Sequence, residues 1–360
     1  RIVPADSNNS EGLRWRGQIL ARIDENDLAG KSFRTAVELE SNNPDTWVAL
    51  VRFLLTSDQR DEAEMEMRNA QVQLPEKFVP MTLARCYELS GSIQTPSRES
   101  RLQSLRQAEQ FYKQALQNDP ENSFVRRSLA NFYIQYGFDI TAFDKANEQL
   151  DWILRDATPN ADSIPNDVAW ARRQRATLMA GSGSYQDYLE AIALLHCNIP
   201  NEQRMAAADL ELYAMLALSR PDSLSRDQAI NEFENIRESR KLSSSEKLLL
   251  AQLYERTNQW DRCQDMMLTL LANFPNNENI LGGYVEMLMR HDQVDEAMRR
   301  LRDFDIESPL RRRVMATVYY EQDKPQLAVQ ELMKMLPNPV PPESNAEIRT
   351  VAILMENIGL

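Results

Sequence analysis

Apolar and small residues in the N-terminal part of the chain repeat with a period of 34 residues, and a period of this length decides the architecture. Five of these positions have an apolar or small counterpart 34 residues later. Leu13, Leu20, Ala29, Phe33 and Ala36 correspond to Trp47, Leu54, Ala63, Met67 and Ala70. Their spacing is that of one face of an α-helix. Pro75 ends the second copy, because proline cannot donate a hydrogen bond to the preceding turn. Each period therefore predicts two helices joined by a turn.

The same phase returns near the C-terminus. Four residues recur 34 positions on, with Cys263, Met267, Leu270 and Pro275 followed by Ala297, Leu301, Phe304 and Pro309. The turn Asp58-Gln59-Arg60-Asp61-Glu62-Ala63 also has a counterpart in Asp292-Gln293-Val294-Asp295-Glu296-Ala297. Two distant parts of the chain thus share one repeating unit.

These residues resemble the tetratricopeptide repeat family, whose unit has large and small residues on a first helix and Ala, a large residue and Ala on a second. The matching strings are Trp47-x-x-Leu50, Ala63-x-x-x-Met67-x-x-Ala70, Ala108-x-x-x-Tyr112-x-x-Ala115, Leu129-Ala130-x-x-Tyr133 and Leu250-Ala251-x-x-Tyr254. The resemblance implies an all-α, right-handed superhelical solenoid of antiparallel helix pairs. Small residues at Ala29, Ala63, Ala108 and Ala297 would let paired helices approach closely.

Extending the phase predicts about nine helix pairs and a lone terminal helix. The expected pairs are 12–41, 44–75, 77–120, 122–159, 165–200, 203–242, 244–275, 277–309 and 310–337, with the lone helix at about 343–358. The sequences Ser243-x-x-Glu246 and Ser344-x-x-Glu347 predict capping boxes, and Pro325 suits a first helical turn.

The match to the repeat is uneven along the chain. Three features depart from the pattern: extra residues between Tyr87 and Ala108, a Pro-rich link at 156–167, and Tyr188 at a position that is usually small. We therefore divide the chain into repeats at 1–159, divergent helical pairs with altered packing at 160–242, and repeats with the terminal helix at 243–360.

Composition and charge narrow the possible partners. Gly is scarce, at 10 residues, and the net charge is −13, which disfavours nucleic acid and anionic membranes as partners. No apolar run approaches the roughly 18 residues of a membrane helix. Three cysteines cannot all pair internally, which mildly favours a reducing compartment but leaves cytoplasmic and periplasmic locations open. The start Arg1-Ile2-Val3-Pro4 suggests a mature or excised fragment.

Candidate catalytic chemistry is sparse. His196-Cys197 lacks the spaced second pair of a zinc site, Cys263 falls at a core position, and no phosphate-binding, nucleophile-elbow or zinc-protease string is present. We therefore expect no enzyme activity, no catalytic residue, no metal and no cofactor.

The exposed side of the first helices supplies the candidate binding residues, since first helices line the ligand groove in this family. The row is Arg14, Gln18, Arg22, Arg52, Arg85, Arg127, Asn131 and Gln135. Arginine and amide side chains can grip carboxylates and peptide backbone, so an acidic or C-terminal peptide is the expected ligand. The alternative is that these are solvated arginines in local helix pairs. No clear lysines of the family's carboxylate clamp are present, which disfavours a chaperone tail as ligand.

The equivalent C-terminal row mixes charged, apolar and polar residues: Gln252, Arg256, Glu286, Met289, Arg290, Arg313, Thr317 and Tyr320.

The sequence predicts a protein-interaction scaffold that binds a peptide or protein in the concave groove. The alternative is the recognition or assembly arm of a larger multidomain enzyme or secretion complex, and self-association stays possible. The fold alone does not identify the function of a protein.

Overall fold

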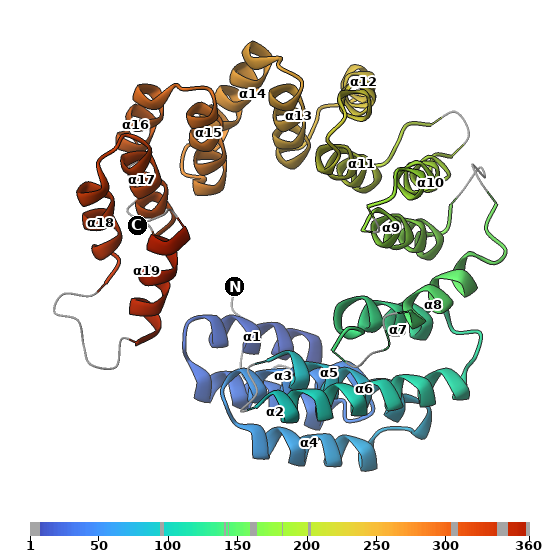
Figure 1. The fold of residues 1–360 in the computed structure, drawn as a ribbon. Helices are drawn as coiled ribbons and strands as arrows, with labels where there is room; N and C mark the ends of the chain where they lie inside the picture. Colours follow the sequence, from blue (N-terminus) through green and yellow to red (C-terminus); the bar gives the residue numbers. More distant parts are fainter. Residues whose placement is uncertain are drawn as a thin grey trace. The chain divides into compact units, whose positions relative to one another are not determined.

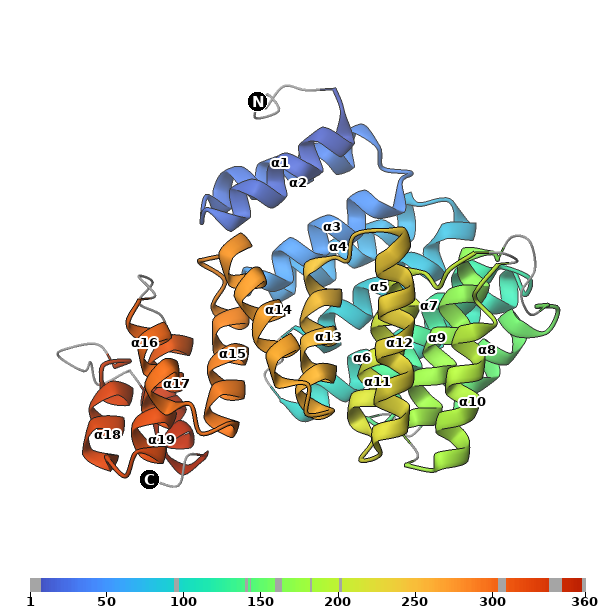
Figure 2. The same ribbon diagram turned by 90° about the horizontal axis from the view of Figure 1, so that it is seen from above.

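A computed structural model describes residues 8–93, 97–139, 142, 144–158, 164–181, 183–200, 203–303, 309–336 and 345–357. Over these ranges the chain is helical without strands, and its helices follow one another as α1 to α19 (Figure 1). Paired helices pack as hairpins within each part of the chain, for example α13 beside α14 in both views (Figure 2). The all-α helical-repeat fold expected from the sequence is confirmed.

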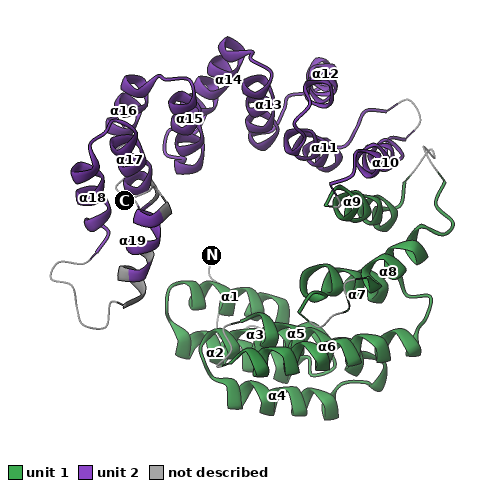
Figure 3. Ribbon diagram, in the orientation of Figure 1, with its two compact units in different colours: residues 1–182 green, residues 183–360 purple. Residues whose placement is uncertain are grey.

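Two compact units make up the chain, residues 1–182 and 183–360 (Figure 3). The sequence-based division into 1–159, 160–242 and 243–360 follows the quality of the repeat match rather than compactness, and stays a prediction. In the described residues, helices α1 to α18 follow one another at the positions expected of the nine predicted pairs, and α19 follows them as the expected terminal helix.

The first unit contains α1 to α9. Their bounds are α1 Ser10–Arg22, α2 Asn26–Leu39, α3 Pro44–Thr56, α4 Arg60–Gln73, α5 Val79–Ser92, α6 Arg98–Asn118, α7 Ser123–Tyr136, α8 Lys145–Leu154 and α9 Asn166–Ala180, with a short 3-10 turn at Glu76–Phe78. The first helices α1, α3 and α5 also pack on one another, so they form one face of the unit.

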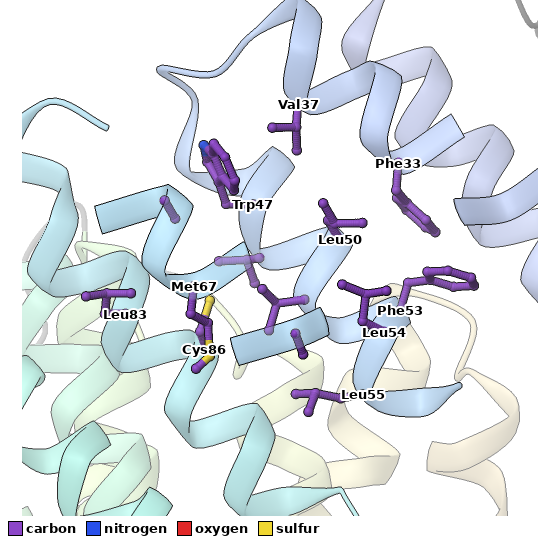
Figure 4. Close-up of a cluster of buried hydrophobic side chains, with 14 of the residues drawn as sticks. Phe33, Val37, Trp47, Leu50, Phe53, Leu54, Leu55, Met67, Leu83 and Cys86 are labelled. Carbon is purple, nitrogen blue, oxygen red and sulfur yellow. The ribbon is translucent and has the colours of Figure 1, made fainter. Parts of the chain in front are cut away.

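A continuous apolar cluster holds the first three pairs together (Figure 4). Trp47, Leu50 and Leu54 of α3 are almost fully buried between the neighbouring helices. Ala29 and Ala63 are completely buried, as predicted, because a larger side chain at either position would push the paired helices apart. Ala108 and Ala297 are buried in the same way.

The second unit contains α10 to α19. Their bounds are α10 Tyr185–His196, α11 Ala207–Ser219, α12 Ser223–Ser239, α13 Ser244–Arg256, α14 Trp260–Asn273, α15 Glu278–Arg290, α16 Val294–Arg302, α17 Pro309–Glu321, α18 Pro325–Met333 and α19 Asn345–Asn357. Cys263 is fully buried in this unit, as expected of a core residue. Tyr188, at the position that is usually small, is also buried, with its ring stacked on Tyr185.

The turns between paired helices explain the repeated polar sequences. Five of them place an Asp or Asn in the left-handed region: Asp24, Asp58, Asn258, Asp292 and Asp323. The next residue then closes the helix end, as when Gln59 N–H donates to the Leu54 carbonyl at 2.8 Å and Gln293 N–H donates to that of Leu288 at 2.9 Å. Asp and Asn tolerate this conformation better than most residues.

Two of the helix-start signals expected from the sequence are present in the described residues. The Ser243–Glu246 capping box is present, and Pro325 lies in the first turn of α18. Ser344 of the second expected capping box, Phe304 of the repeated pattern and Pro159 of the Pro-rich link lie outside the described residues. None of the helices in the described ranges combines the length and apolarity needed to cross a bilayer.

Candidate protein-interaction surface

Helix register brings a polar stripe onto the first-helix face of the N-terminal unit. In α1, Leu13, Gly17 and Leu20 are buried against the neighbouring helices. The side of α1 next to these buried residues carries three of the predicted residues, Arg14, Gln18 and Arg22, and all three line a pocket. Gly17 is required for this packing, because a Cβ there would lie 2.8 Å from the Phe33 ring. The sequence therefore sets both the buried and the exposed sides of α1.

A pocket of about 630 Å³ opens between these helices. Its lining comes from α1, α2, α3 and α5 and comprises Arg14, Gln18, Ala21, Arg22, Phe33, Asp45, Val48, Ala49, Arg52, Phe53, Thr56 and Arg85. Four arginines and one aspartate give the lining a formal charge of +3, in a chain whose net charge is −13. We call this the N-terminal pocket.

Asp45 partly neutralises two of the four arginines. Arg85 Nη1 donates to Asp45 Oδ1 at 2.8 Å, and Arg14 Nη1 lies 4.0 Å from Oδ2 of the same carboxylate. The Asp45 side chain is 52% exposed, so water weakens both attractions. These two arginines are oriented but not fully compensated.

The side chains of Arg22 and Arg52 make no ion pair in the described part of the chain. Both are exposed, and both line the N-terminal pocket. Their guanidinium groups are therefore available to an anionic ligand, and Arg52 lies on the central helix of the face. Apolar wall is provided beside them by Val48, Ala49 and Phe53.

A second pocket of about 320 Å³ continues the first one toward α7. It shares Val48, Arg52 and Arg85 with the N-terminal pocket and reaches Asn131. Glu88 also lines it; burial raises the pKa of Glu88, and its carboxylate accepts a hydrogen bond from the Tyr112 hydroxyl at 2.5 Å. The predicted residues Arg14, Gln18, Arg52, Arg85 and Asn131 are thus brought into two adjoining pockets.

Arg127 and Gln135 lie outside these two pockets. Arg127 Nη1 donates to Asp167 Oδ1 of α9 at 2.9 Å, and its guanidinium lies 4.9 Å from the centre of the Trp170 ring. Gln135 is exposed on α7. The packing of α7 against α9 therefore engages Arg127 within the protein.

The corresponding face of the C-terminal unit carries a pocket of about 360 Å³ over α15 and α17, which we call the C-terminal pocket. It is lined by Val285, Glu286, Met289, Arg290, Arg313, Val314, Thr317, Val318 and Glu321. Two arginines and two glutamates balance to a formal charge of zero. Arg290 also donates from Nε and Nη2 to the two oxygens of Glu255 at 2.7 and 3.0 Å.

The candidate nucleophiles and ligands remain separate from these pockets. Burial raises the pKa of the Cys86 and Cys263 thiols to about 12, so both are poor nucleophiles near neutral pH. His196 Nδ1 lies 2.9 Å from the Ile192 carbonyl oxygen, and its ring meets Tyr213 edge-on. Over the described residues, no three His, Cys, Asp or Glu side chains gather in a manner suited to a metal ion.

Sequence reasoning missed two features of the N-terminal pocket. Asp45 lies seven residues before Arg52, which puts both on one side of α3, so helical spacing could have identified it. Phe33 comes from the second helix of the first pair and lines the pocket because Gly17 leaves room for its ring. No one-helix pattern could have indicated Phe33.

No model of a known protein family matches the chain. Among curated proteins, the chain is 24% identical to cellulose synthase operon protein C of Pseudomonas fluorescens (strain SBW25) over 288 residues. The match covers 77% of this chain and 21% of that protein, so the chain spans about a fifth of the length of this relative.

Several solved structures are similar in their helical repeats. A tetratricopeptide repeat protein from Parabacteroides merdae is 14% identical and covers 97% of this chain and 99% of its own, with a TM-score of 0.38. Yeast Tom70 is 10% identical, with coverages of 98% and 89% and a TM-score of 0.42. A human IFIT1 dimer with m7Gppp-AAAA is 12% identical, with coverages of 91% and 76% and a TM-score of 0.42. Likeness at this level concerns the fold alone.

Proposed function

We propose that this chain, a helical-repeat protein of the tetratricopeptide type, is a protein-interaction scaffold whose N-terminal pocket binds an acidic peptide segment of a partner. The observation that carries the proposal is that Arg22 and Arg52 line this pocket without an ion pair in the described residues. An acidic protein that keeps uncompensated arginines in one concavity has a place for a negatively charged ligand.

The chemistry of the lining favours a peptide over a small anion. Guanidinium groups bind carboxylates through two parallel hydrogen bonds, which suits glutamate, aspartate or a C-terminal carboxylate. The apolar wall of Val48, Ala49 and Phe53 can accept an aliphatic side chain next to the charged one. Asn131, in the adjoining pocket, can hydrogen-bond to peptide backbone.

The test is calorimetric titration of the 360-residue protein with an acidic peptide of about ten glutamate and leucine residues. The double substitution Arg22→Glu and Arg52→Glu should weaken binding at this site about tenfold or more, because it replaces two attractions by repulsions. Raising the ionic strength from about 0.01 M to about 0.15 M, which shortens the screening length from about 30 to about 8 Å, should weaken binding to the wild type.

A matched control keeps the charge change and moves it off the face. Arg98→Glu with Arg106→Glu makes the same change on exposed positions of α6, outside both pockets of the first-helix face. This control should bind the peptide within about twofold of the wild type. Equal weakening in both double variants would mean that general electrostatic attraction explains the binding, and would overturn the proposal.

A second candidate function is favoured by the curated match, which spans 21% of the length of its relative. In this alternative the chain is one segment of a longer repeat protein that joins the parts of an assembly such as a cellulose-synthesis complex. The native polypeptide, isolated from its source and measured by mass spectrometry, should then be much heavier than 41.5 kDa. A native mass equal to that of these residues alone would exclude it.

A further inference from the structure

A second cationic pocket lies in the C-terminal unit, away from the first-helix face. It occupies about 710 Å³ and is built by α12, α13, α14 and the link between α12 and α13. Helix α13 packs against both α12 and α14 and lies between them in both views (Figure 2). The lining residues are Arg237, Lys241, Leu242, Lys247, Tyr254, Arg262, Asp265, Met266, Thr269 and Asn273.

Positive charge exceeds negative charge in this lining, with four cationic side chains against Asp265. Glu234 partly compensates the charge of the two arginines: it accepts a hydrogen bond from Arg262 Nη2 at 2.5 Å, and its carboxylate lies 3.5 Å from Arg237 Nη1. Lys241 and Lys247 make no ion pair within the part of the chain that the structure describes. Two ammonium groups are therefore left to attract an anion.

The position of the lysines follows from the helix start of α13. Arg240 is held by Glu246 through two hydrogen bonds of 2.8 and 2.5 Å, and Glu246 also closes the capping box with Ser243. This fixes the link on which Lys241 lies, and Lys247 follows in the first turn of α13. The ammonium groups therefore project from an anchored segment.

The rest of the lining selects the kind of anion. Met266 gives the pocket apolar surface, since Leu242 and Tyr254 also line it but are almost fully buried, and Thr269 and Asn273 add neutral hydrogen-bonding groups at the α14 end. The face of the Tyr254 ring is already covered by the Arg262 guanidinium, 4.2 Å from the ring centre. Single-stranded nucleic acids bind by stacking bases on open aromatic rings. A covered ring and a chain charge of −13 favour a peptide over nucleic acid.

We propose that this pocket is a second binding site for an acidic peptide segment, independent of the N-terminal pocket and built on α12, α13 and α14. Glutamate or aspartate side chains of the ligand contact Lys241 and Lys247, and an apolar ligand side chain rests on Met266. The ligand reaches the protein from the side of the second helices of the repeats, so one chain can hold two acidic segments at once.

The experiment uses fluorescence anisotropy of a labelled peptide of about ten glutamate and leucine residues with the 360-residue protein. Binding is measured in the wild type and in the Arg22→Glu, Arg52→Glu variant, in which the N-terminal pocket is disabled. Lys241→Glu with Lys247→Glu should weaken binding at the second site about tenfold in both backgrounds. If only Arg22→Glu with Arg52→Glu weakens peptide binding, the result supports the N-terminal pocket and contradicts the second site. The two proposals can therefore fail separately.

The control is Lys324→Glu with Arg302→Glu, which makes the same charge change at exposed positions of the same unit outside this pocket. It should leave affinity within about twofold. The milder pair Lys241→Gln with Lys247→Gln, whose helicity is compared by circular dichroism, should weaken binding about threefold and guards against a folding defect. The proposal is overturned if the lysine variants bind like their parent, if the control weakens binding equally, or if a single-stranded oligonucleotide displaces the peptide more effectively than unlabelled peptide does.

Discussion

The N-terminal and C-terminal pockets occupy the same place in the repeat, on neighbouring first helices, and differ in what their arginines contact. The N-terminal lining has a formal charge of +3, while the C-terminal lining balances to zero. In the first, Asp45 is 52% exposed and is shared by Arg14 and Arg85. In the second, the Glu255 side chain is 5% exposed and binds Arg290 through both oxygens.

The depth of the carboxylate explains why Asp45 and Glu255 hold their arginines differently. A buried carboxylate needs its partner, because it would otherwise be left charged away from water, so Glu255 keeps Arg290 in a fixed position. An exposed carboxylate is already solvated, and its hold on an arginine is weak. One repeat scaffold can therefore carry a structural arginine in one unit and a ligand-accessible arginine in the other.

The largest expected effect tests whether the two units share the same packing. Ala63→Trp in the first unit and Ala297→Trp in the second should each destabilise the protein by about 3 kcal/mol, because both alanines are fully buried where paired helices meet. Chemical denaturation measures the cost. Glu64→Ala, which loses only an exposed contact with Arg68 at 3.8 Å, should stay within about 0.5 kcal/mol. A cost that is large in one unit and small in the other would show unequal packing.

The next effect breaks the electrostatic contrast itself. Glu255→Ala should destabilise the protein by about 2 kcal/mol, less than a fully buried pair would cost because Arg290 is 44% exposed. The substitution should also free Arg290 and so give the C-terminal pocket affinity for an acidic peptide. Asp45→Ala should cost less than about 0.5 kcal/mol and strengthen peptide binding at the N-terminal pocket. Denaturation and peptide titration of both variants measure these outcomes, and similar stability losses would refute the contrast.

A smaller, pH-dependent effect is expected from the capping box of α13. The hydrogen bonds from Arg240, aided by the backbone of Ser243, hold the pKa of Glu246 below its usual 4.5. The folded state therefore gains stability that is fully present above about pH 4.5 and is lost as the pH falls through the lowered pKa. Glu246→Gln should lower stability at pH 7 and flatten this part of the acid profile. An unchanged acid profile would exclude this role of Glu246.

The smallest effect concerns the turns that both units share. Asp58 and Asp292 have φ values of 58° and 56°, which cost less for glycine than for residues with a Cβ. Asp58→Gly and Asp292→Gly should each change stability by no more than about 0.5 kcal/mol, whereas Asp58→Ala should lose about 1 kcal/mol. Thermal unfolding of the three variants compares them. A glycine variant as damaged as the alanine variant would show that the carboxylate, and not the backbone conformation, is essential.

The predicted binding row shows how far one-dimensional reasoning extends. Helical spacing correctly put Arg14, Gln18 and Arg52 on the exposed side of the first helices, where they line one pocket. The same reasoning gave Arg127 equal weight, although Asp167 of α9 engages it from 40 residues away. Partners this distant in sequence are not specified by the helix on which an arginine lies.

The second cationic pocket, which contains Lys241 and Lys247, was not predicted from the sequence. Its cationic residues come from α12, the following link, α13 and α14, and each looks like an ordinary exposed charge on its own segment. Only the packing of α12 and α14 on α13 gathers them around one space. The signal available in the sequence was the short run Arg240-Lys241, which by itself is common on solvated helix ends.

The sequence by itself determined the helices, their turns and the small residues between them, because helix spacing, capping and close packing depend on residues within one repeat of about 34 positions. The capping box at Ser243 and the buried Ala63 are examples. Tertiary structure alone decided which arginines and lysines remain available to a ligand. That outcome depends on whether a carboxylate from another helix comes within hydrogen-bonding reach and how deeply it is buried, and both are set by packing between repeats.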